Sequence, residues 1–366
     1  MKLIFLYPLA IFIFLLNALN PVCAKEVAIA GTEVRQLYSQ KVGQQYSLQI
    51  NLPMGFDKNL SYPVIYLLDS QWDFPLIAAT YGQMYYDGFV PAAVIVGITW
   101  GEGDDPNVKR VRDFTPSKIQ GEIESGGAAN FLNFIKTELI PFIDKEYATN
   151  QQRVLMGSSL GGLFTLYALF NEPQLFSAYI PTASASGWDN DVLYRYAQTN
   201  DEKLRGLLVK HPVNLYSAVG ELDNLKTDFV KMQDFFAQQQ YAGLRLKTEI
   251  LTNLGHAGIK APGNAWGLQF ALQKADIALT ESELAHWLGK YKSITTDEIV
   301  SVSMQQGRLS LTRGDGQLDN FYNASANLFY QKGELYQLGF SQVESLPVNL
   351  TIERFGLVEK FKQIAN

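Results

Sequence analysis

Between about residues 33 and 253, short apolar runs alternate with longer segments of helical periodicity, and no other feature constrains the fold as much. The runs "YPVIYLLD" (62–69) and "AAVIVGIT" (92–99) are continuous apolar stretches, typical of strands buried on both faces. A helix is predicted over residues 226–240. Repeated strand and helix units of this kind predict an α/β fold, a mostly parallel sheet flanked by helices. Such sheets place their functional sites at the carboxyl ends of strands.

Two segments modify this pattern. The stretch "QQYSLQINLPMGF" (44–56) alternates apolar and polar residues, which predicts an antiparallel strand at the edge of the sheet. The stretch "GGAANFLNFIKTELIPFIDKEY" (126–147) has apolar residues at helical spacing. We expect Pro141 to bend or end that helix, because proline removes a backbone N–H.

The pattern changes near residue 280. Thr280 and Glu283 have the spacing of a capping box, which predicts a short helix. Beyond it, period-two alternation around glycine-containing turns predicts an antiparallel β unit. The sequence therefore predicts an α/β domain over residues 25–280 and a small β-rich C-terminal domain over residues 281–366.

The first 24 residues have the features of an export signal. Lys2 precedes a nearly unbroken apolar run over residues 3–19, and Val22 and Ala24 satisfy the small-residue rule of a cleavage site. We interpret residues 1–24 as a signal peptide, which predicts a periplasmic or secreted protein with no stable membrane insertion after cleavage. The alternative is an uncleaved membrane anchor, but the run is short for a bilayer span and contains Pro8.

Composition excludes several classes of chemistry. Cleavage after Ala24 would remove Cys23, the single cysteine, and with it any disulfide, thiolate nucleophile or cysteine zinc site. The chain has 30 Lys and Arg residues against 36 Asp and Glu residues, which argues against nucleic acid as a partner. Without a dinucleotide or phosphate-binding glycine motif, we expect no cofactor. We expect no metal either, because the Asp104–Asp105 loop lacks regular ligand spacing.

The stretch "VLMGSSLGGL" (154–163) contains the strongest functional motif. Gly157, Ser159 and Gly161 fit G-x-S-x-G between a strand-like and a helix-like segment, the context of a nucleophile elbow. In such an elbow the serine occupies a strained turn above the sheet, and a Cβ at either glycine would collide with its neighbours. The sequence therefore predicts Ser159 as a nucleophile. The backbone N–H of Leu160 would stabilise an oxyanion.

A serine hydroxyl needs a base, and the chain has three histidines. His211 precedes a predicted strand and would lie at its amino end. His286 lies in the helix that leads to the β-rich unit. His256, in the loop "NLGHAGI" after the last strand of the large domain, is therefore the predicted base, and we expect its imidazole to share a hydrogen bond with Ser159.

The remaining site residues follow from chain order. The acid that orients the histidine should lie between serine and histidine, and "YSAVGELDN" offers Asp223, our choice, with Glu221 as the alternative. A second oxyanion amide should come from "YLLDSQWDF", where either Ser70 or Gln71 could donate and Gln71 is preferred. Three tryptophans just past predicted strands suggest an aromatic substrate cleft: Trp72, Trp100 and Trp188.

These residues resemble the putative-esterase branch of the α/β-hydrolases, which includes esterase D, siderophore trilactone esterases, feruloyl esterases and mycolyltransferases. The matching segments cover about residues 33–275, in the order "PVIYLLDSQWDF", "RVRDFTP", "RVLMGSSLGGLFTLYALF", "GELDN" and "GHAGI". The resemblance implies Ser159 as nucleophile, His256 as base, and Leu160 with Gln71 as oxyanion donors. Ser70 departs from the glycine that many members have there.

Three functions follow as hypotheses. The first is an exported serine hydrolase that cleaves a carboxylic ester of siderophore, feruloyl or acyl type, with a small-molecule ester as its substrate. The second is an acyltransferase that passes the same acyl group to an alcohol. The third is a binding protein for a ligand or glycan on a hydrolase scaffold. Lys109, Arg110 and Arg112 could form a positive patch for an anionic siderophore.

Overall fold

The structure is a computed structural model that describes residues 28–122, 124–314, 316, 318–343, 347–355 and 357–364. Residues 31–366 form one compact unit. The predicted signal peptide lies outside the described residues. In the described ranges, no helix is long and apolar enough to cross a membrane.

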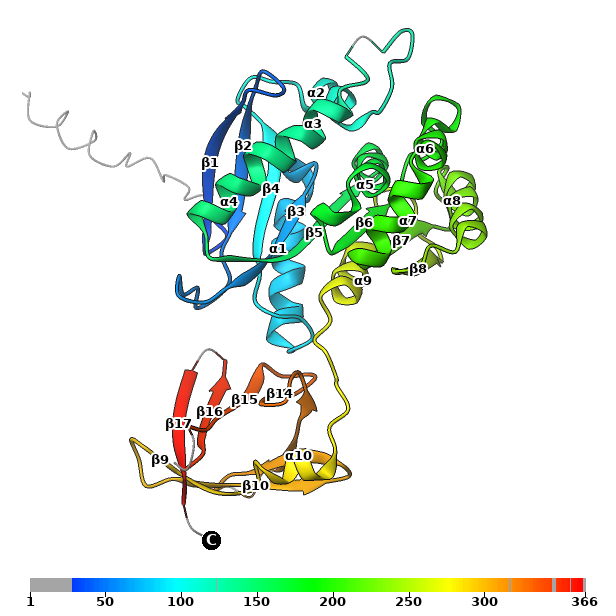
Figure 1. Cartoon of the computed structure of the whole chain (residues 1–366). Helices are drawn as coiled ribbons and strands as arrows, with labels where there is room; N and C mark the ends of the chain where they lie inside the picture. The colour runs from blue at the N-terminus through cyan, green and yellow to red at the C-terminus, as the bar shows by residue number, and fades with distance from the viewer. Residues whose placement is uncertain are drawn as a thin grey trace, which may run out of the picture. The chain divides into compact units, whose positions relative to one another are not determined.

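The first sheet has eight strands (Figure 1). Strands β1–β2 and β2–β4 pair antiparallel, and every other neighbouring pair is parallel. This mixed sheet confirms the predicted α/β-hydrolase fold. The strand order is β1 (Thr32–Ser39), β2 (Gln44–Asn51), β4 (Val94–Trp100), β3 (Tyr62–Leu67), β5 (Thr149–Ser158), β6 (Ala178–Thr182), β7 (Val213–Gly220) and β8 (Leu244–Leu251).

One strand is not where the sequence placed it. The antiparallel strand expected at the edge, β2, is second in the order, and β1 lies outside it. The sequence of β1, TEVRQLYS, is largely polar and exposed. An outer strand buries little of its surface, so β1 lacks the apolar pattern that would have revealed it.

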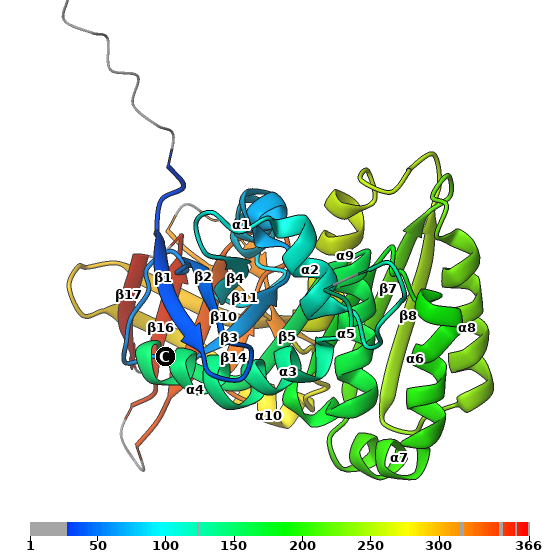
Figure 2. The same ribbon diagram turned by 90° about the horizontal axis from the view of Figure 1, so that it is seen from above.

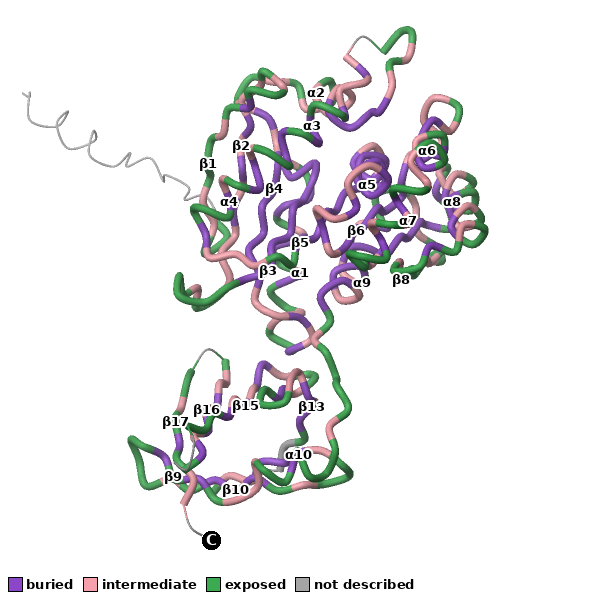
Figure 3. Tube along the Cα trace, viewed as in Figure 1, coloured by how far each residue is buried: buried purple, intermediate pink, exposed green. Residues whose placement is uncertain are grey.

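Two clusters of buried apolar side chains cover the faces of the first sheet. Figure 2 shows helices on both sides of this sheet, and Figure 3 shows its central strands as buried. Every residue of β3 is buried. Consecutive residues point to opposite faces, so Tyr66 and Leu67 belong to different core clusters. The helices α1 (Ser70–Tyr86) and α9 (Lys260–Leu272) pack on one face. The opposite face is covered by α2 (Pro106–Phe114), α3 (Ala128–Phe134), α4 (Ile140–Glu146), α5 (Leu160–Asn171), α6 (Trp188–Thr199), α7 (Asp201–Lys210) and α8 (Lys226–Gln239).

The helix expected to bend or end at Pro141 instead continues through it. A π-helical turn, Ile135–Leu139, joins α3 to α4, and Pro141 is the second residue of α4. Proline clashes with the carbonyl four residues earlier in an α-helix. Here that residue, Thr137, lies in the wider turn, which accommodates the ring.

The second sheet has nine strands, and all of its neighbouring pairs are antiparallel, as the sequence predicted. Its two outermost strands, β12 and β13, are separated in the chain only by the buried Phe321. The sheet therefore curls around its core until its two edges meet. The order is β12 (Leu318–Asn320), β11 (Arg308–Thr312), β10 (Ile299–Gln305), β9 (Gly289–Ser293), β17 (Leu357–Ile364), β16 (Asn349–Arg354), β15 (Tyr336–Ser341), β14 (Leu328–Tyr330) and β13 (Tyr322–Asn323).

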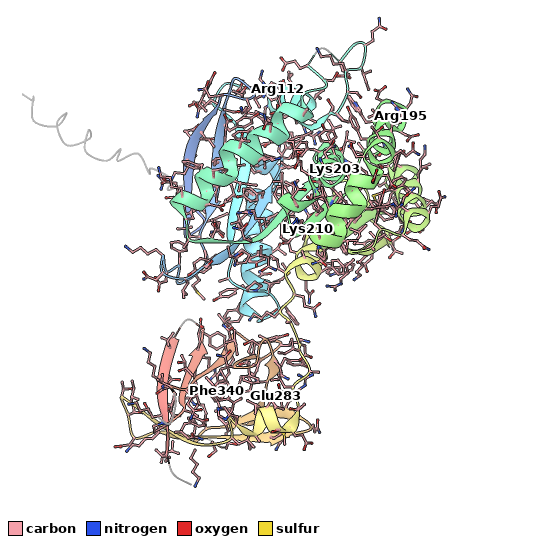
Figure 4. The ribbon with its side chains drawn as sticks, in the orientation of Figure 1. Arg112, Arg195, Lys203, Lys210, Glu283 and Phe340 are labelled. Atoms are coloured by element: carbon pink, nitrogen blue, oxygen red, sulfur yellow. The ribbon has the colours of Figure 1, made fainter. Side chains whose placement is uncertain are left out.

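The short helix α10 (Glu281–Ala285) precedes this sheet, and the capping box is confirmed. Thr280 Oγ1 accepts a hydrogen bond from the Glu283 N–H at 3.3 Å, and the Glu283 carboxylate accepts one from the Thr280 N–H at 2.7 Å. Figure 4 labels Glu283 on this helix and Phe340, which stacks on Trp287 in the core of the second sheet.

Candidate active site

Ser159 lies in the turn between β5 and α5, with φ 60° and ψ −119°. This conformation is costly for a residue with a Cβ and persists only where the surroundings enforce it. A Cβ at Gly157 would lie 2.7 Å from the carbonyl carbon of Gly161. The two glycines therefore allow a backbone-to-backbone contact that closes the turn beneath the serine, as the motif predicted.

Backbone hydrogen bonds hold the elbow against β6. The Ser159 N–H donates to the carbonyl of Thr182 at 3.1 Å. The Ser159 carbonyl accepts from the N–H groups of Leu163 at 2.9 Å and Ala185 at 3.1 Å. Ser159 as a whole is half-buried. The turn is thus fixed while the residue keeps access to solvent.

His256 lies in the loop after β8, and its Nδ1 is 2.9 Å from Oδ2 of Asp223. The Asp223 side chain is completely buried, and its other oxygen accepts the Leu225 N–H at 2.9 Å. A carboxylate on Nδ1 fixes the ring and leaves Nε2 available to accept a proton. Between the two acids proposed from the sequence, the geometry pairs Asp223 with the imidazole.

Glu221 contacts another part of the same loop. Its carboxylate accepts a hydrogen bond from the Asn253 N–H at 3.1 Å. The Leu222 N–H donates to the carbonyl of Leu254 at 2.9 Å. The turn after β7 therefore hydrogen-bonds to the backbone of the histidine loop as well as to the His256 imidazole.

Ser159, Asp223 and His256 follow β5, β7 and β8, so all three lie at the carboxyl edge of the sheet. The expected hydrogen bond between Ser159 and His256 is not among those of the described residues. Catalytic hydrogen bonds often form fully only with substrate in place. The His256 side chain is 42% exposed, which gives the ring less packing than its buried partner Asp223.

The other two histidines lie elsewhere, as expected. His211 is exposed, follows α7, and precedes the amino end of β7. His286 is also exposed and contacts Trp287 after α10.

The two predicted oxyanion donors occupy the first turns of two helices. Leu160 is the first residue of α5 and Gln71 the second residue of α1. N–H groups in a first helical turn have no partner within the helix. A Cβ at Gly161 would lie 3.3 Å from Oδ2 of Asp69, so the elbow and the β3–α1 turn are in contact.

Ser70, the alternative donor, is fully buried against β4. A Cβ at Gly97 would lie 2.6 Å from the Ser70 Cβ. The missing Cβ at Gly97 thus makes room for the Ser70 side chain.

Sequence reasoning missed the charged residues around the β3–α1 turn. Asp69 adopts a left-handed conformation with φ 54° and is 2% exposed. The Arg110 guanidinium binds both of its oxygens, at 3.0 and 2.7 Å. Burial raises the pKa of the Asp69 carboxyl, and Arg110 opposes that shift. An acid directly after a buried strand was the available signal.

The expected positive patch is largely neutralised. Arg110 binds Asp69, and Arg112, labelled in Figure 4, donates to both oxygens of the buried Asp113 at 2.7 and 3.0 Å. Lys109 Nζ lies 3.5 Å from the Glu124 carboxylate. These cations support acidic neighbours within the protein.

The three tryptophans differ in exposure. Trp72 is 47% exposed, and the Arg110 guanidinium lies 5.6 Å from its ring centre. Trp188 is half-buried, and its Nε1 donates to the Ser117 carbonyl at 3.4 Å. Trp100 was wrongly assigned to the cleft, because it is 5% exposed and its Nε1 donates to Asp113 at 2.7 Å. A buried carboxylate needs such donors, which holds Trp100 in the core.

Within the described ranges, no cluster of three or more His, Cys, Asp and Glu side chains could hold a metal ion.

The strand order 1-2-4-3-5-6-7-8, with a G-x-S-x-G elbow after β5, defines an α/β-hydrolase. The model of the family described as "Putative esterase" matches residues 39–257. The chain belongs to this esterase family, and it is a hydrolase.

Several proteins that are similar to this chain are named as siderophore esterases. Ferri-bacillibactin esterase BesA of Bacillus subtilis (strain 168) is 29% identical over 265 residues, which cover 67% of this chain and 90% of BesA. A siderophore triacetylfusarinine C esterase of Aspergillus fumigatus is 28% identical over 158 residues, 40% of this chain and 54% of that protein. The crystal structure of the BES protein from Bacillus cereus has a TM-score of 0.61 and 26% identity, covering 68% of this chain and 98% of that one.

Proposed function

We propose that this protein is a serine esterase that hydrolyses the ester bonds of a siderophore through an acyl-enzyme on Ser159. The observation that carries the proposal is the 2.9 Å contact between His256 Nδ1 and Asp223 at the sheet edge where the strained Ser159 turn lies. That arrangement supports an oriented base at the same sheet edge as the Ser159 turn, where a base is needed to activate the serine hydroxyl.

In the first half-reaction, Ser159 Oγ attacks the ester carbonyl carbon and His256 Nε2 takes the hydroxyl proton. The carbonyl oxygen becomes an oxyanion, which the backbone N–H groups of Leu160 and Gln71 stabilise. Asp223 stabilises the imidazolium that forms. The C–O bond then breaks, His256 gives its proton to the leaving alcohol, and the acyl group remains on Ser159.

In the second half-reaction, His256 takes a proton from water as the water oxygen attacks the acyl carbon. A second oxyanion forms between the same two N–H groups. The bond to Ser159 Oγ breaks, His256 returns the proton to the serine, and the carboxylic acid leaves. Each proton passes through Nε2, since Nδ1 is held by Asp223.

The substrate class rests on the relatives. BesA and the Aspergillus fumigatus protein are both named as siderophore esterases. The exposed Trp72 next to Arg110 gives the candidate site an aromatic surface with a neighbouring cation, suited to an aryl or acyl group of such a ligand.

The proposed place of action is outside the cytoplasm. The support is the sequence of residues 1–24, an apolar run followed by small residues at a cleavage position. Fractionation of the native host, with an N-terminal sequence beginning after Ala24, tests this; an intact N-terminus in the cytoplasm would contradict it.

The mechanism is tested with Ser159→Ala. We expect release of p-nitrophenol from short acyl esters, and cleavage of a catecholate trilactone, to fall by at least about 10³-fold while circular dichroism stays unchanged. A fluorophosphonate probe should label the wild type and not the variant. Ser303→Ala, an exposed serine in β10, is the matched control and should keep full labelling. Turnover retained in Ser159→Ala would refute the proposal.

A further inference from the structure

The helix α9 begins four residues after His256 and is held to α1 by an ion pair. Nζ of Lys260, the first residue of α9, lies 2.9 Å from both carboxylate oxygens of Asp73. Asp73 is 4% exposed, and the Lys260 side chain is 21% exposed. Asp73 belongs to the first turn of α1, which also contains Gln71.

The next turn of α9 is bound to the strand end that carries Ser159. Asn264 Oδ1 accepts the Thr182 hydroxyl at 3.1 Å, and the oxygens of Thr182 and Ser158 are 2.6 Å apart. All three residues are buried. Lys260 and Asn264 are four positions apart and therefore lie on the same side of the helix.

The histidine loop is continuous with this helix. The Ile259 N–H donates to the carbonyl of Gly255 at 3.2 Å, and the Lys260 N–H donates to the carbonyl of Ala257 at 3.2 Å. The Ile259 side chain is fully buried. A helix-like turn thus spans residues 255–260, so a shift of the start of α9 would move the His256 backbone with it.

We propose that Lys260 and Asp73 are positioning residues that fix the His256 imidazole relative to the Ser159 hydroxyl and the oxyanion amides. This inference rests on the proposed function. The ion pair joins the segment that carries the base to the turn that carries the Gln71 amide, and Asn264 joins the same helix to the nucleophile strand. The three parts of the site, which come from distant chain segments, thereby share one support.

Stability alone does not explain a charged contact here. A buried ion pair recovers little net free energy after desolvation, and apolar residues of similar size often serve as well. The ion pair fixes the position of the start of α9, because the Lys260 ammonium donates to both carboxylate oxygens of the buried Asp73. Misplacement of a catalytic group by about 1 Å can cost about 100-fold in rate.

The test uses Lys260→Met, the double variant Asp73→Asn with Lys260→Met, and Lys260→Arg. The double variant removes both charges, so no unpaired buried carboxylate destabilises the fold. We expect it to lower kcat about 10- to 100-fold with KM within about twofold. Lys260→Arg keeps the ion pair and should restore most of kcat. The rate of fluorophosphonate labelling of Ser159 should fall in parallel with kcat.

Lys231→Met is the control, because it removes a more exposed lysine of the same domain, which pairs with Asp191 between α8 and α6. It should leave kcat unchanged. A double variant with wild-type kcat, whatever its melting temperature, would show that the pair is only structural and would overturn the inference. Failure of the proposed function is distinguishable, since the wild type itself would then show neither turnover nor labelling.

Discussion

The two sheets of this protein differ in how their strands are buried. In the first sheet the central strands are buried along their length, as in β3 and β6, and apolar clusters cover both faces. In the second sheet, buried and exposed residues alternate, as in β9 and β10, around a single cluster. A sheet covered on both faces leaves only its strand ends open to a ligand.

Charged residues follow the same division. In the first sheet, Asp69, Asp73 and Asp223 are buried at or just beyond strand ends, where each meets a cation or an imidazole. In the second sheet, Arg313 binds Glu298 and Glu359 across strands. The buried carboxylates of the first sheet thus gather near the candidate site, whereas the ion pairs of Arg313 join segments of the second sheet.

The largest expected effect is a loss of kcat that distinguishes Asp223 from Glu221. Asp223→Asn should lower kcat about 10³- to 10⁴-fold, because the amide cannot hold the imidazole in the required tautomer or stabilise the imidazolium. Glu221→Gln is the control, since an amide oxygen can still accept the Asn253 N–H, and its kcat should stay within about threefold of wild type. Steady-state kinetics with a p-nitrophenyl ester measures both. Equal losses in the two variants would contradict the pairing.

The next effect concerns the elbow. Gly157→Ala places a Cβ against the backbone of Gly161, which cannot move without α5, and should lower the free energy of unfolding by about 3 kcal/mol. Gly206→Ala, in the exposed face of α7 with no atom within 4 Å of the new Cβ, should instead raise it by about 0.5 kcal/mol. Urea denaturation measures both. A neutral Gly157→Ala would show that the turn can relax.

The tryptophans give a smaller effect. Trp100→Phe removes a hydrogen bond to the buried Asp113 and should lower the free energy of unfolding by about 2 kcal/mol with KM unchanged. Trp72→Ala should leave the free energy of unfolding within about 0.5 kcal/mol and raise KM, because its ring is exposed and Trp72 follows Gln71, the proposed oxyanion donor. The same denaturation series and substrate titration decide between them. A raised KM in Trp100→Phe would indicate that Trp100 contributes to the substrate cleft after all.

The smallest effect lies in the second sheet. Arg313→Met leaves Glu298 and Glu359 without their shared cation and should destabilise β10 and β17 locally by about 1 kcal/mol. Hydrogen exchange of the amides in these strands measures it. Esterase activity should not change, and a loss of activity would show that the second sheet contributes to catalysis.

The features predicted best from the sequence are those that a short stretch of the chain specifies by itself. The elbow at Ser159, the capping box at Thr280 and the helix α8 are all specified within a few positions of the chain. The chain order of Ser159, Asp223 and His256 could also be predicted, because serine, acid and histidine follow one another in this order in α/β-hydrolases. The domain boundary near residue 280 remains a prediction.

Contacts between distant segments that no motif specifies could not be predicted. Asp69 and Arg110 are 41 positions apart, and Asp73 and Lys260 are 187 apart. Trp72 comes soon after β3 and Trp100 is the last residue of β4, yet only Trp100 donates a hydrogen bond to a buried carboxylate. Which of the two becomes buried depends on packing by helices that no local pattern specifies.

The curled second sheet has a practical consequence. Its outermost strands, β12 and β13, are only three and two residues long and adjoin Phe321, so among the described residues that sheet offers only very short outer strands to which another chain could add. In the first sheet, β1 and β8 remain as outer strands. If concentrated solutions of this protein form oligomers by strand addition, the joining surface will be one of those two strands, and a proline substitution there is the remedy to try first.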